Sequence, residues 1–489
     1  MKLLAIEVLL LSSACLLCPA NSTASVLDRQ ADALLQWKSG LDGHGSCLNS
    51  WTKGTNTCNW TGIVCSTSDD APGILSISLN SCGISGNLDG FWFAEFPHLQ
   101  GLDLGNNSIS GPIPSSIGRL VDLFDLDLSS NRFSGSIPTS FGNLTVLTSL
   151  DLSSNLLSQG LSDSGIGTLD ILEVLDISKN KLTGPIPYSL GNLSTLYFLD
   201  LSFNKFSGHI PHELGMLQRL ISLYLFRNEI TGSIPNELGM LQDLVSLDLS
   251  NNRITGFIPN LGNLTSLVSL VLYDNRIAGF IPNLGNLTSL VSLVLSSNQI
   301  TDLSFNKFSG LIPQELALLY SLVSLDLSKN EIMGFIPASI GNLSILQLLN
   351  LSNNQIRGFI PSTFWKLTNL RTVGLESNDL SGVLSPEIGV LGPIPQELGY
   401  CFDLHELDLS RNYLSGAIPL RLSYLYKLQD LNLSYNSLSG RFLGLSTIKS
   451  VTVVSLDHNM GICGDPQYGL TGCKASKYDD KIIALRILL

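Results

Sequence analysis

The sequence predicts an α/β repeat solenoid, a stack of similar coils whose short parallel strands form one concave sheet. The pattern L-x-x-L-x-L-x-x-N-x-[LIF]-x-G-x-[IL]-P returns along most of the 489 residues, and most copies start 23 to 25 residues apart. A chain that repeats itself can grow by stacking and needs no single central core. The first leucines of the copies are Leu99, Leu123, Leu147, Leu172, Leu196, Leu220, Leu244, Leu267, Leu290, Leu322, Leu346, Leu370, Leu404 and Leu428.

The physics of one coil follows from the alternation of its residues. Leu126 and Leu128 point to one side of a strand, and Asp125 and Asp127 point to the other. The leucines fill the interior, and stacking at about 4.8 Å gives a concave sheet about 65 Å long over fourteen coils. The asparagine of each copy, such as Asn131, follows the strand, where its amide can satisfy backbone groups that the turn buries. The period lies in the range of leucine-rich repeats.

The first 24 residues are expected to form a signal peptide. Lys2 supplies the positive start, and an apolar run from residue 8 to residue 17 is followed by small residues at Ala20 and Ala24, after either of which cleavage is expected. The run is too short to cross a membrane. A net charge of −13 and the absence of a basic stripe exclude a nucleic-acid partner.

Export indicates that the cysteines form disulfides. Cys58 with Cys65, and Cys463 with Cys473, enclose short loops at the two ends of the repeat array, where an open solenoid needs protection. Cys47, Cys82 and Cys401 remain, and an odd number leaves at least one thiol free.

Two of these three cysteines are expected to be buried thiols. Cys82 stands at the ladder position, which accepts Asn or Cys, so a buried thiol is favoured there over a disulfide or a reactive site. Cys401 takes the place that Leu144 holds in an earlier coil. The partner of Cys47 stays open.

Three stretches resemble the ectodomains of plant leucine-rich-repeat receptor-like kinases. The I-P dipeptides after the ladder resemble the plant-specific repeat class; residues 33–65, with A-L-L-Q-W-K and C-N-W-T-G-I-V-C, resemble the N-terminal cap; and residues 459–473 resemble the C-terminal cap. The resemblance implies a right-handed superhelix with a 3-10 or irregular convex side and disulfide caps. It implies five segments: a signal peptide (1–24), an N-terminal cysteine cap (25–72), repeats (73–442), a C-terminal repeat and cap (443–476) and the start of a membrane span (477–489).

The resemblance also implies a function. It predicts an extracellular ectodomain that binds a peptide or a cell-wall-derived signal on the concave face and engages a co-receptor ectodomain. The alternative is a secreted wall-defence protein of the polygalacturonase-inhibitor type. The expected location is the apoplast, or the outside of the plasma membrane in a form with a complete span, which residues 477–489 are too short to provide.

Two steps break the repeat period. Residues 298–313 and 380–404 contain steps of 32 and 34 residues. Each could be an island loop that shapes a ligand site or the product of a deletion or gene-model error, and the repeat-like text favours the second interpretation.

The sequence contains no catalytic set. A kinase's Gly-rich loop, H-R-D and D-F-G motifs are absent, and the six histidines are scattered without a zinc-binding motif. We therefore expect no enzyme activity, no cofactor and no metal. The aspartates of the fifth strand position, from Asp103 to Asp408, predict a hydrated acidic stripe that favours cationic ligands.

The predicted ligand site is a run of middle coils whose outward residues are large and apolar. Third, fifth and seventh positions point outward, and most coils place Asp and Ser at the fifth and seventh. Exposed aromatic residues on a rigid sheet dominate binding hot spots, and an arginine beside them can pair with a ligand carboxylate. The predicted site residues are Phe198, Tyr224, Phe226, Arg227, Val271, Tyr273 and Val294.

N-x-[ST] sequons predict many glycans in an exported chain. Those in G-N-L-[ST] are expected on the convex return, whereas Asn350 and Asn432 replace the aspartate of the concave stripe. The predicted glycan sites are Asn59, Asn106, Asn143, Asn192, Asn263, Asn286, Asn342, Asn350 and Asn432.

Overall fold

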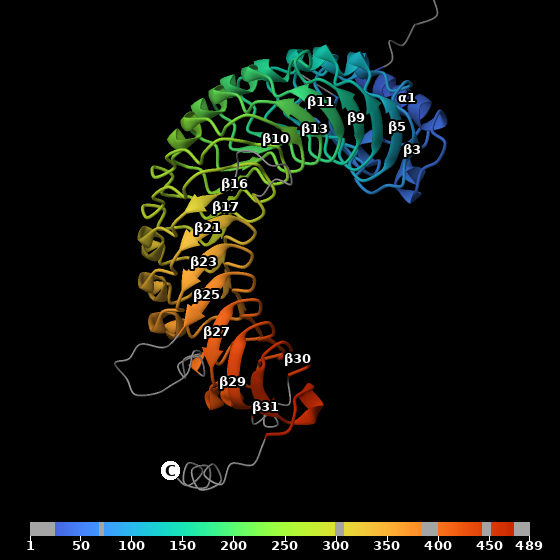
Figure 1. The fold of residues 1–489 in the computed structure, drawn as a ribbon. Helices are drawn as coiled ribbons and strands as arrows, with labels where there is room; N and C mark the ends of the chain where they lie inside the picture. The colour runs from blue at the N-terminus through green and yellow to red at the C-terminus, as the bar shows by residue number, and fades with distance from the viewer. Residues whose placement is uncertain (1–24, 68–72, 299–307, 383–399, 443–450, 474–489) are drawn as a thin grey trace, which may run out of the picture.

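The computed structural model describes residues 25–67, 73–298, 308–382, 400–442 and 451–473. The expected signal peptide, residues 477–489 and most of both irregular steps lie outside these ranges. The coils stack into a curved arc with the N-terminal helix at one end and the last strands at the other (Figure 1). This architecture is the predicted solenoid.

A single large sheet lines the inside of the arc. Within the described residues it has seventeen strands, of which the first, β1 (Ile63–Cys65), is antiparallel to its neighbour and the others are parallel. The fourteen predicted coils each contribute one strand, and one more lies at each end. These strands are β2 (Ile74–Ser78), β4 (Gly101–Asp103), β6 (Asp125–Asp127), β8 (Ser149–Asp151), β10 (Val174–Asp176), β12 (Phe198–Asp200), β14 (Ser222–Tyr224), β16 (Ser246–Asp248), β17 (Ser269–Val271), β18 (Ser292–Val294), β20 (Ser324–Asp326), β22 (Leu348–Asn350), β24 (Thr372–Gly374), β26 (Glu406–Asp408), β28 (Asp430–Asn432) and β30 (Val453–Ser455).

A second set of parallel strands, which the sequence reasoning did not predict, runs along the side of the solenoid. It forms two seven-stranded sheets, and each strand follows the ladder asparagine of its coil. The first sheet contains β3 (Ser85–Gly86), β5 (Ser108–Pro112), β7 (Arg132–Gly135), β9 (Leu156–Gln159), β11 (Lys181–Pro185), β13 (Lys205–Gly208) and β15 (Glu229–Ile230), and the second contains β19 (Ser309–Gly310), β21 (Glu331–Gly334), β23 (Gln355–Gly358), β25 (Asp379–Gly382), β27 (Tyr413–Gly416), β29 (Ser437–Phe442) and β31 (Gly461–Gly464).

Short 3-10 helices form the convex side, as expected. Most begin directly after the proline of the I-P dipeptide, whose fixed φ suits the entry to a helical turn. The two 23-residue coils, between β16 and β18, have no such helix. The convex helices are η3 (Phe93–Glu95), η4 (Ser115–Arg119), η5 (Thr139–Asn143), η6 (Ile166–Thr168), η7 (Tyr188–Asn192), η8 (His212–Met216), η9 (Asn236–Met240), η10 (Gln314–Leu318), η11 (Ala338–Asn342), η12 (Ser362–Lys366) and η14 (Leu420–Tyr424).

The core is one continuous column of leucine, isoleucine and phenylalanine that runs through all described coils. The ladder asparagines close it at the turn. Asn204 is buried; its amide donates to the carbonyls of Ile177 and Leu201 at 3.0 and 3.2 Å, and its side-chain oxygen accepts from the Leu182 amide at 3.0 Å. Each asparagine therefore joins its own coil to the one before it.

The N-terminal cap is built around tryptophans. Helix α1 (Val26–Ser39) begins with a capping box between Ser25 and Asp28, and it buries Trp37. Two further short 3-10 helices, η1 (Ser46–Ser50) and η2 (Thr57–Asn59), lead into β1. Trp51 and Trp60 are stacked with ring centroids 5.5 Å apart. These rings cover the first coil, which has no preceding neighbour.

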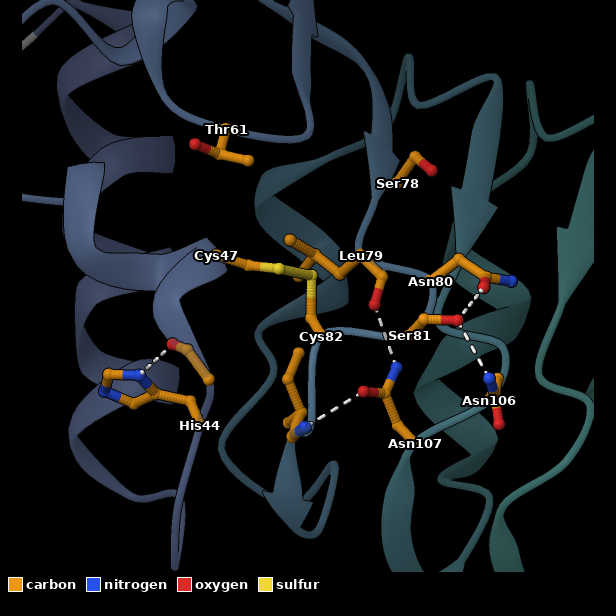
Figure 2. Close-up of a disulfide and its surroundings, with 12 residues drawn as sticks. His44, Cys47, Thr61, Ser78, Leu79, Asn80, Ser81, Cys82, Asn106 and Asn107 are labelled. Carbon is orange, nitrogen blue, oxygen red and sulfur yellow. Dashed lines mark hydrogen bonds between the residues drawn. A yellow bond between two sulfur atoms is a disulfide. The ribbon is translucent and has the colours of Figure 1, made fainter.

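The disulfides agree with the sequence in two cases and correct it in one. Cys58–Cys65 and Cys463–Cys473 are bonded, the second pair beside η15 (Pro466–Tyr468). Cys82, which we expected to be a buried free thiol, forms a disulfide with Cys47 that ties the cap to the first coil (Figure 2).

The physical reason for this correction is that Cys82 has a partner that later ladder positions lack. The first coil lies against the loop before η1, which brings Cys47 within reach: the Gly45 amide donates to the Cys82 carbonyl at 2.9 Å. Cys401 is a buried free thiol, as expected, and burial raises its pKa to about 12.

Candidate functional site on the concave face

The concave strands present their third and fifth residues outward and bury the residue between them. In β12, Leu199 is buried, whereas Phe198 and Asp200 are partly exposed, and the same alternation holds in β14 and β16. The expected outward positions are therefore the positions that the structure offers to a ligand.

Three predicted site residues come together on the first two of these strands. Phe198 and Tyr224 meet edge to face with ring centroids 5.9 Å apart, and Tyr224 lies 6.4 Å from Phe226. Phe226 also contacts Phe203 at 5.2 Å, and the Arg227 guanidinium lies 4.8 Å from the Phe203 ring centroid. We refer to these five residues as the aromatic cluster. Its cation is positioned over a ring and is exposed to solvent.

Sequence reasoning missed Phe203 because it considered only the outward positions of the strands. Phe203 is the eighth residue of its coil, where the backbone turns with a left-handed φ of 52°. The same conformation recurs at the eighth residue of the neighbouring coils, including Arg227 and Asn251. An aromatic residue where other coils place polar ones was the signal that could have identified it.

The other predicted residues form a separate patch. Strand register places Asp248 directly between Tyr224 and Val271, because β16 lies between β14 and β17. Val271 pairs in turn with Val294. Tyr273, two residues after Val271, is half-buried on the same coil. The predicted site is thus two apolar patches separated by one carboxylate.

That carboxylate belongs to a partly buried acidic column. Desolvation raises the pKa of Asp248 above its ordinary value, although the amide and hydroxyl of Ser250 donate to it at 2.9 and 2.6 Å and lower the pKa. Burial likewise raises the pKa of Asp176 and Asp200, and it raises that of Asp151 to about 6. The column therefore gains protons in mildly acidic surroundings.

An open hollow of about 470 Å³ adjoins the aromatic cluster at the starts of the same strands. Tyr197, Ile221 and Val245 form its apolar part, and each precedes the first residue of β12, β14 or β16. Glu173, Thr195, Arg219, Asp243 and Ser266 complete the lining. The cluster and the hollow together offer rings, aliphatic side chains and charges of both signs over adjacent coils.

The predicted glycan sites differ in accessibility. Asn350 and Asn432 are half-buried on the concave face, and their side-chain oxygens accept from the amides of Ser352 and Ser434 at 3.1 and 3.2 Å. Glycans on these two asparagines remain a prediction that competes with these contacts. The other seven are exposed: Asn59, Asn106, Asn143, Asn192, Asn263, Asn286 and Asn342.

Two searches of the described residues are also informative. No group of three or more histidine, cysteine, aspartate or glutamate side chains in this part of the chain could hold a metal ion. None of the helices described is long and apolar enough to cross a membrane.

Family models match most of the chain. The leucine rich repeat N-terminal domain matches residues 27–66, the leucine-rich repeat region matches residues 166–309, and further leucine-rich-repeat models match residues 72–133, 320–380 and 403–425. The chain is a leucine-rich-repeat protein. Its repeats are of the class found in plant receptor kinase ectodomains.

Curated relatives and solved structures support this class. The Arabidopsis thaliana LRR receptor-like serine/threonine-protein kinase RGI3 is 35% identical over 98 residues, and the probable leucine-rich repeat receptor-like protein kinase At1g35710 from the same plant is 38% identical over 116 residues. These alignments cover 20% and 22% of this chain but only 9% and 10% of the relatives. The chain is therefore similar to a small part of each receptor kinase.

The solved receptors match over a longer stretch. PEPR1 in its structure with AtPEP1 has a TM-score of 0.79 at 34% identity, over 90% of this chain and 59% of PEPR1. A TDR receptor has a TM-score of 0.71 at 31% identity, over 79% of this chain and 64% of the receptor. The leucine-rich-repeat chain thus shares the ectodomain fold of these receptors and spans less than two thirds of each.

Proposed function

We propose that this leucine-rich-repeat chain is an extracellular recognition module that binds a peptide on the concave face across β12 to β18. The observation that supports the proposal most directly is the aromatic cluster on β12 and β14. Four rings in edge contact offer a large contact area, and because packing already limits their rotation, binding costs little conformational entropy.

A peptide suits the chemistry of this surface. Arg227 is held over the Phe203 ring and can receive a ligand carboxylate. Asp248 and the acidic column beside it can receive basic side chains, while the patch of Val271 and Tyr273 accepts an apolar one. The likeness to PEPR1, solved with AtPEP1, supports a peptide over a wall polysaccharide.

Signalling through a co-receptor ectodomain is part of the proposal. A solenoid whose concave face holds the ligand leaves its lateral faces for a second protein. In this view the chain itself performs no catalysis.

The test is a binding panel measured by titration calorimetry. The panel contains synthetic plant-secreted peptides, including AtPEP1, and pectin oligosaccharides of similar mass. We expect at least one peptide to bind and the oligosaccharides not to bind. A panel in which only oligosaccharides bind would overturn the peptide assignment.

The matched variant carries Tyr224→Ser, Phe226→Ser and Tyr273→Ser. These side chains are partly exposed, so folding should persist, and a bound peptide should lose several kcal/mol at about 2 kcal/mol for each hot-spot residue. The control is Tyr188→Ser on the convex side, where the ring is 72% exposed and far from the site. Unchanged peptide affinity in the triple variant would place the site elsewhere.

A further inference from the structure

A second apolar surface lies on the side of the solenoid, away from the concave face. In the G-x-I-P turn of five successive coils, the residue after the glycine is large, apolar and exposed. Earlier coils place small or polar residues there, such as Ser136, His209 and Ser233. We call the five residues the lateral strip: Phe257 (68% exposed), Phe280 (71%), Leu311 (64%), Phe335 (58%) and Phe359 (63%).

The strip is continuous because each side chain lies over the glycine of the next coil. A Cβ added at Gly279 would clash with the Phe257 ring, and one added at Gly310 would clash with the Phe280 ring. The same relation joins Leu311 to Gly334. Backbone hydrogen bonds hold these coils in line: the Ala278 amide donates to the Gly256 carbonyl at 2.7 Å. The result is a rigid row of apolar groups spaced by one coil, about 4.8 Å.

The area of the strip is large for a surface that faces water. Aromatic side chains bury about 150–250 Å² each, so five groups about two thirds exposed present roughly 600 Å². A monomer's largest apolar patch is about 300–600 Å² and often marks an interaction site. A stable interface buries about 800 Å² per partner, which the strip and its flanking residues can supply.

No predicted glycan obstructs this face. The second-sheet segments 251–258, 274–281, 329–336 and 353–360 contain no N-x-[ST] sequon, whereas Asn263, Asn286 and Asn342 lie on the convex return of these coils. A protein surface could therefore approach the strip directly.

The order of the side chains points to a specific occupant. Phe, Phe, Leu, Phe, Phe reads the same in both directions from Leu311. A two-fold axis along the strand direction at Leu311 would place Phe280 against Phe335 and Phe257 against Phe359 of a second copy. Only another copy of the chain is certain to have the same coil spacing, so that its rings can interdigitate along the whole strip.

The residues beside the strip obey the same symmetry. Outward residues of the second-sheet segments alternate, so Arg276, Ala278 and Phe280 share one face, as do Glu331, Met333 and Phe335. The two-fold would set Arg276 against Glu331, opposite in charge, and Ala278 against Met333, small against large. A parallel arrangement would instead pair like charges.

We propose that the lateral strip is a homodimer interface, in which two copies of this chain pack about a two-fold axis at Leu311 with their coils in opposite order. The interface lies on a different face from the proposed peptide site, and either proposal can fail without the other.

The first test measures the mass of the secreted chain by analytical ultracentrifugation between about 1 and 100 µM, the range in which weak protein dimers form. We expect a dimer, which Phe280→Asp with Phe335→Asp should convert to monomer. The control Tyr188→Asp changes an exposed ring on η7 and should leave the dimer intact. A wild-type chain that stays monomeric throughout, or a dimer that survives the double substitution, would refute the proposal.

The second test determines the symmetry by disulfide trapping. Leu311→Cys should crosslink with its own copy, because it lies on the axis. Phe257→Cys and Phe359→Cys should each stay uncrosslinked alone, since the two copies of either lie roughly 20 Å apart at about 4.8 Å per coil, and should crosslink when mixed. Self-crosslinking of Phe257→Cys would contradict the two-fold arrangement. Arg276→Glu should weaken the dimer, and adding Glu331→Arg should restore it.

Discussion

Single polar side chains determine where each coil turns. Asn204 satisfies the amide and the carbonyls that its turn would otherwise bury without partners, and it links two coils through hydrogen bonds. The repeat of this residue predicted its role from the sequence. The aspartate of the fifth position plays a similar part, since Asp151 accepts from the Ser153 amide at 2.8 Å.

Removing a ladder amide should be costly. We expect Asn204→Ala to lower the free energy of unfolding by about 2–3 kcal/mol, because it leaves buried backbone groups unpaired. Asn236→Ala, at the exposed start of η9, should change it by less than about 0.5 kcal/mol. Urea unfolding measures both variants, and equal stabilities would disprove the role of the ladder.

The acidic column should make stability depend on pH. Burial raises the folded-state pKa of Asp151 to about 6, above the 3.8 of an unperturbed aspartate, so the folded chain binds this proton more tightly than the unfolded one. The stability that this group contributes is therefore complete below about pH 3.8 and is lost as the pH rises through about 6.

Asp151→Asn is the variant that isolates this effect, because Asn350 and Asn432 fill the same position in other coils and keep the acceptor. The variant should raise the melting temperature relative to wild type at pH 7.5 and lose that advantage near pH 4. Calorimetric scans across this range measure the difference, and a difference that does not vary with pH would contradict the raised pKa.

At the scale of elements, the caps and the lateral sheets limited what the sequence could predict. The repeat identified every concave strand of the fourteen coils, since alternation and burial act within one coil. The lateral strands depend on hydrogen bonds between coils, as from the Thr231 amide to the Gly208 carbonyl, and no pattern within one coil reveals them. Cys82 was misjudged for a related reason: its partner comes from the cap, which lies outside the repeat.

The corrected disulfide should stabilise the N-terminal cap. Its residues are 35 apart in sequence, against 7 for Cys58 and Cys65, so the loop that it closes is longer. In the chain-entropy account, removing it costs about 4 kcal/mol, against about 2.5 kcal/mol for the shorter loop. Replacing Cys47 and Cys82 together by serine should lower the unfolding midpoint in urea more than replacing Cys58 and Cys65. The reverse order would contradict this assignment, and so would free Cys82 in a non-reducing peptide map.

At the scale of the whole molecule, the solenoid separates two surfaces that face different directions. The concave face offers the aromatic cluster and the acidic column, and the lateral face offers the strip. Sequence position alone identified Phe198, Tyr224, Phe226 and Arg227 on the concave face. It did not show that Asp248 divides them from Val271, because strand register is set by stacking.

The most direct test of the central claim, that the aromatic cluster is the ligand surface, is site-specific photocrosslinking of a bound peptide. Ser222 pairs with Phe198 across β12 and β14 and lies two residues before Tyr224, so a photoreactive phenylalanine there would stand within the cluster. The control site is Ser149 on β8, three coils away on the same face. We predict that the peptide crosslinks at position 222 and not at 149. A peptide that binds but crosslinks only at 149, or at neither position, would contradict the account.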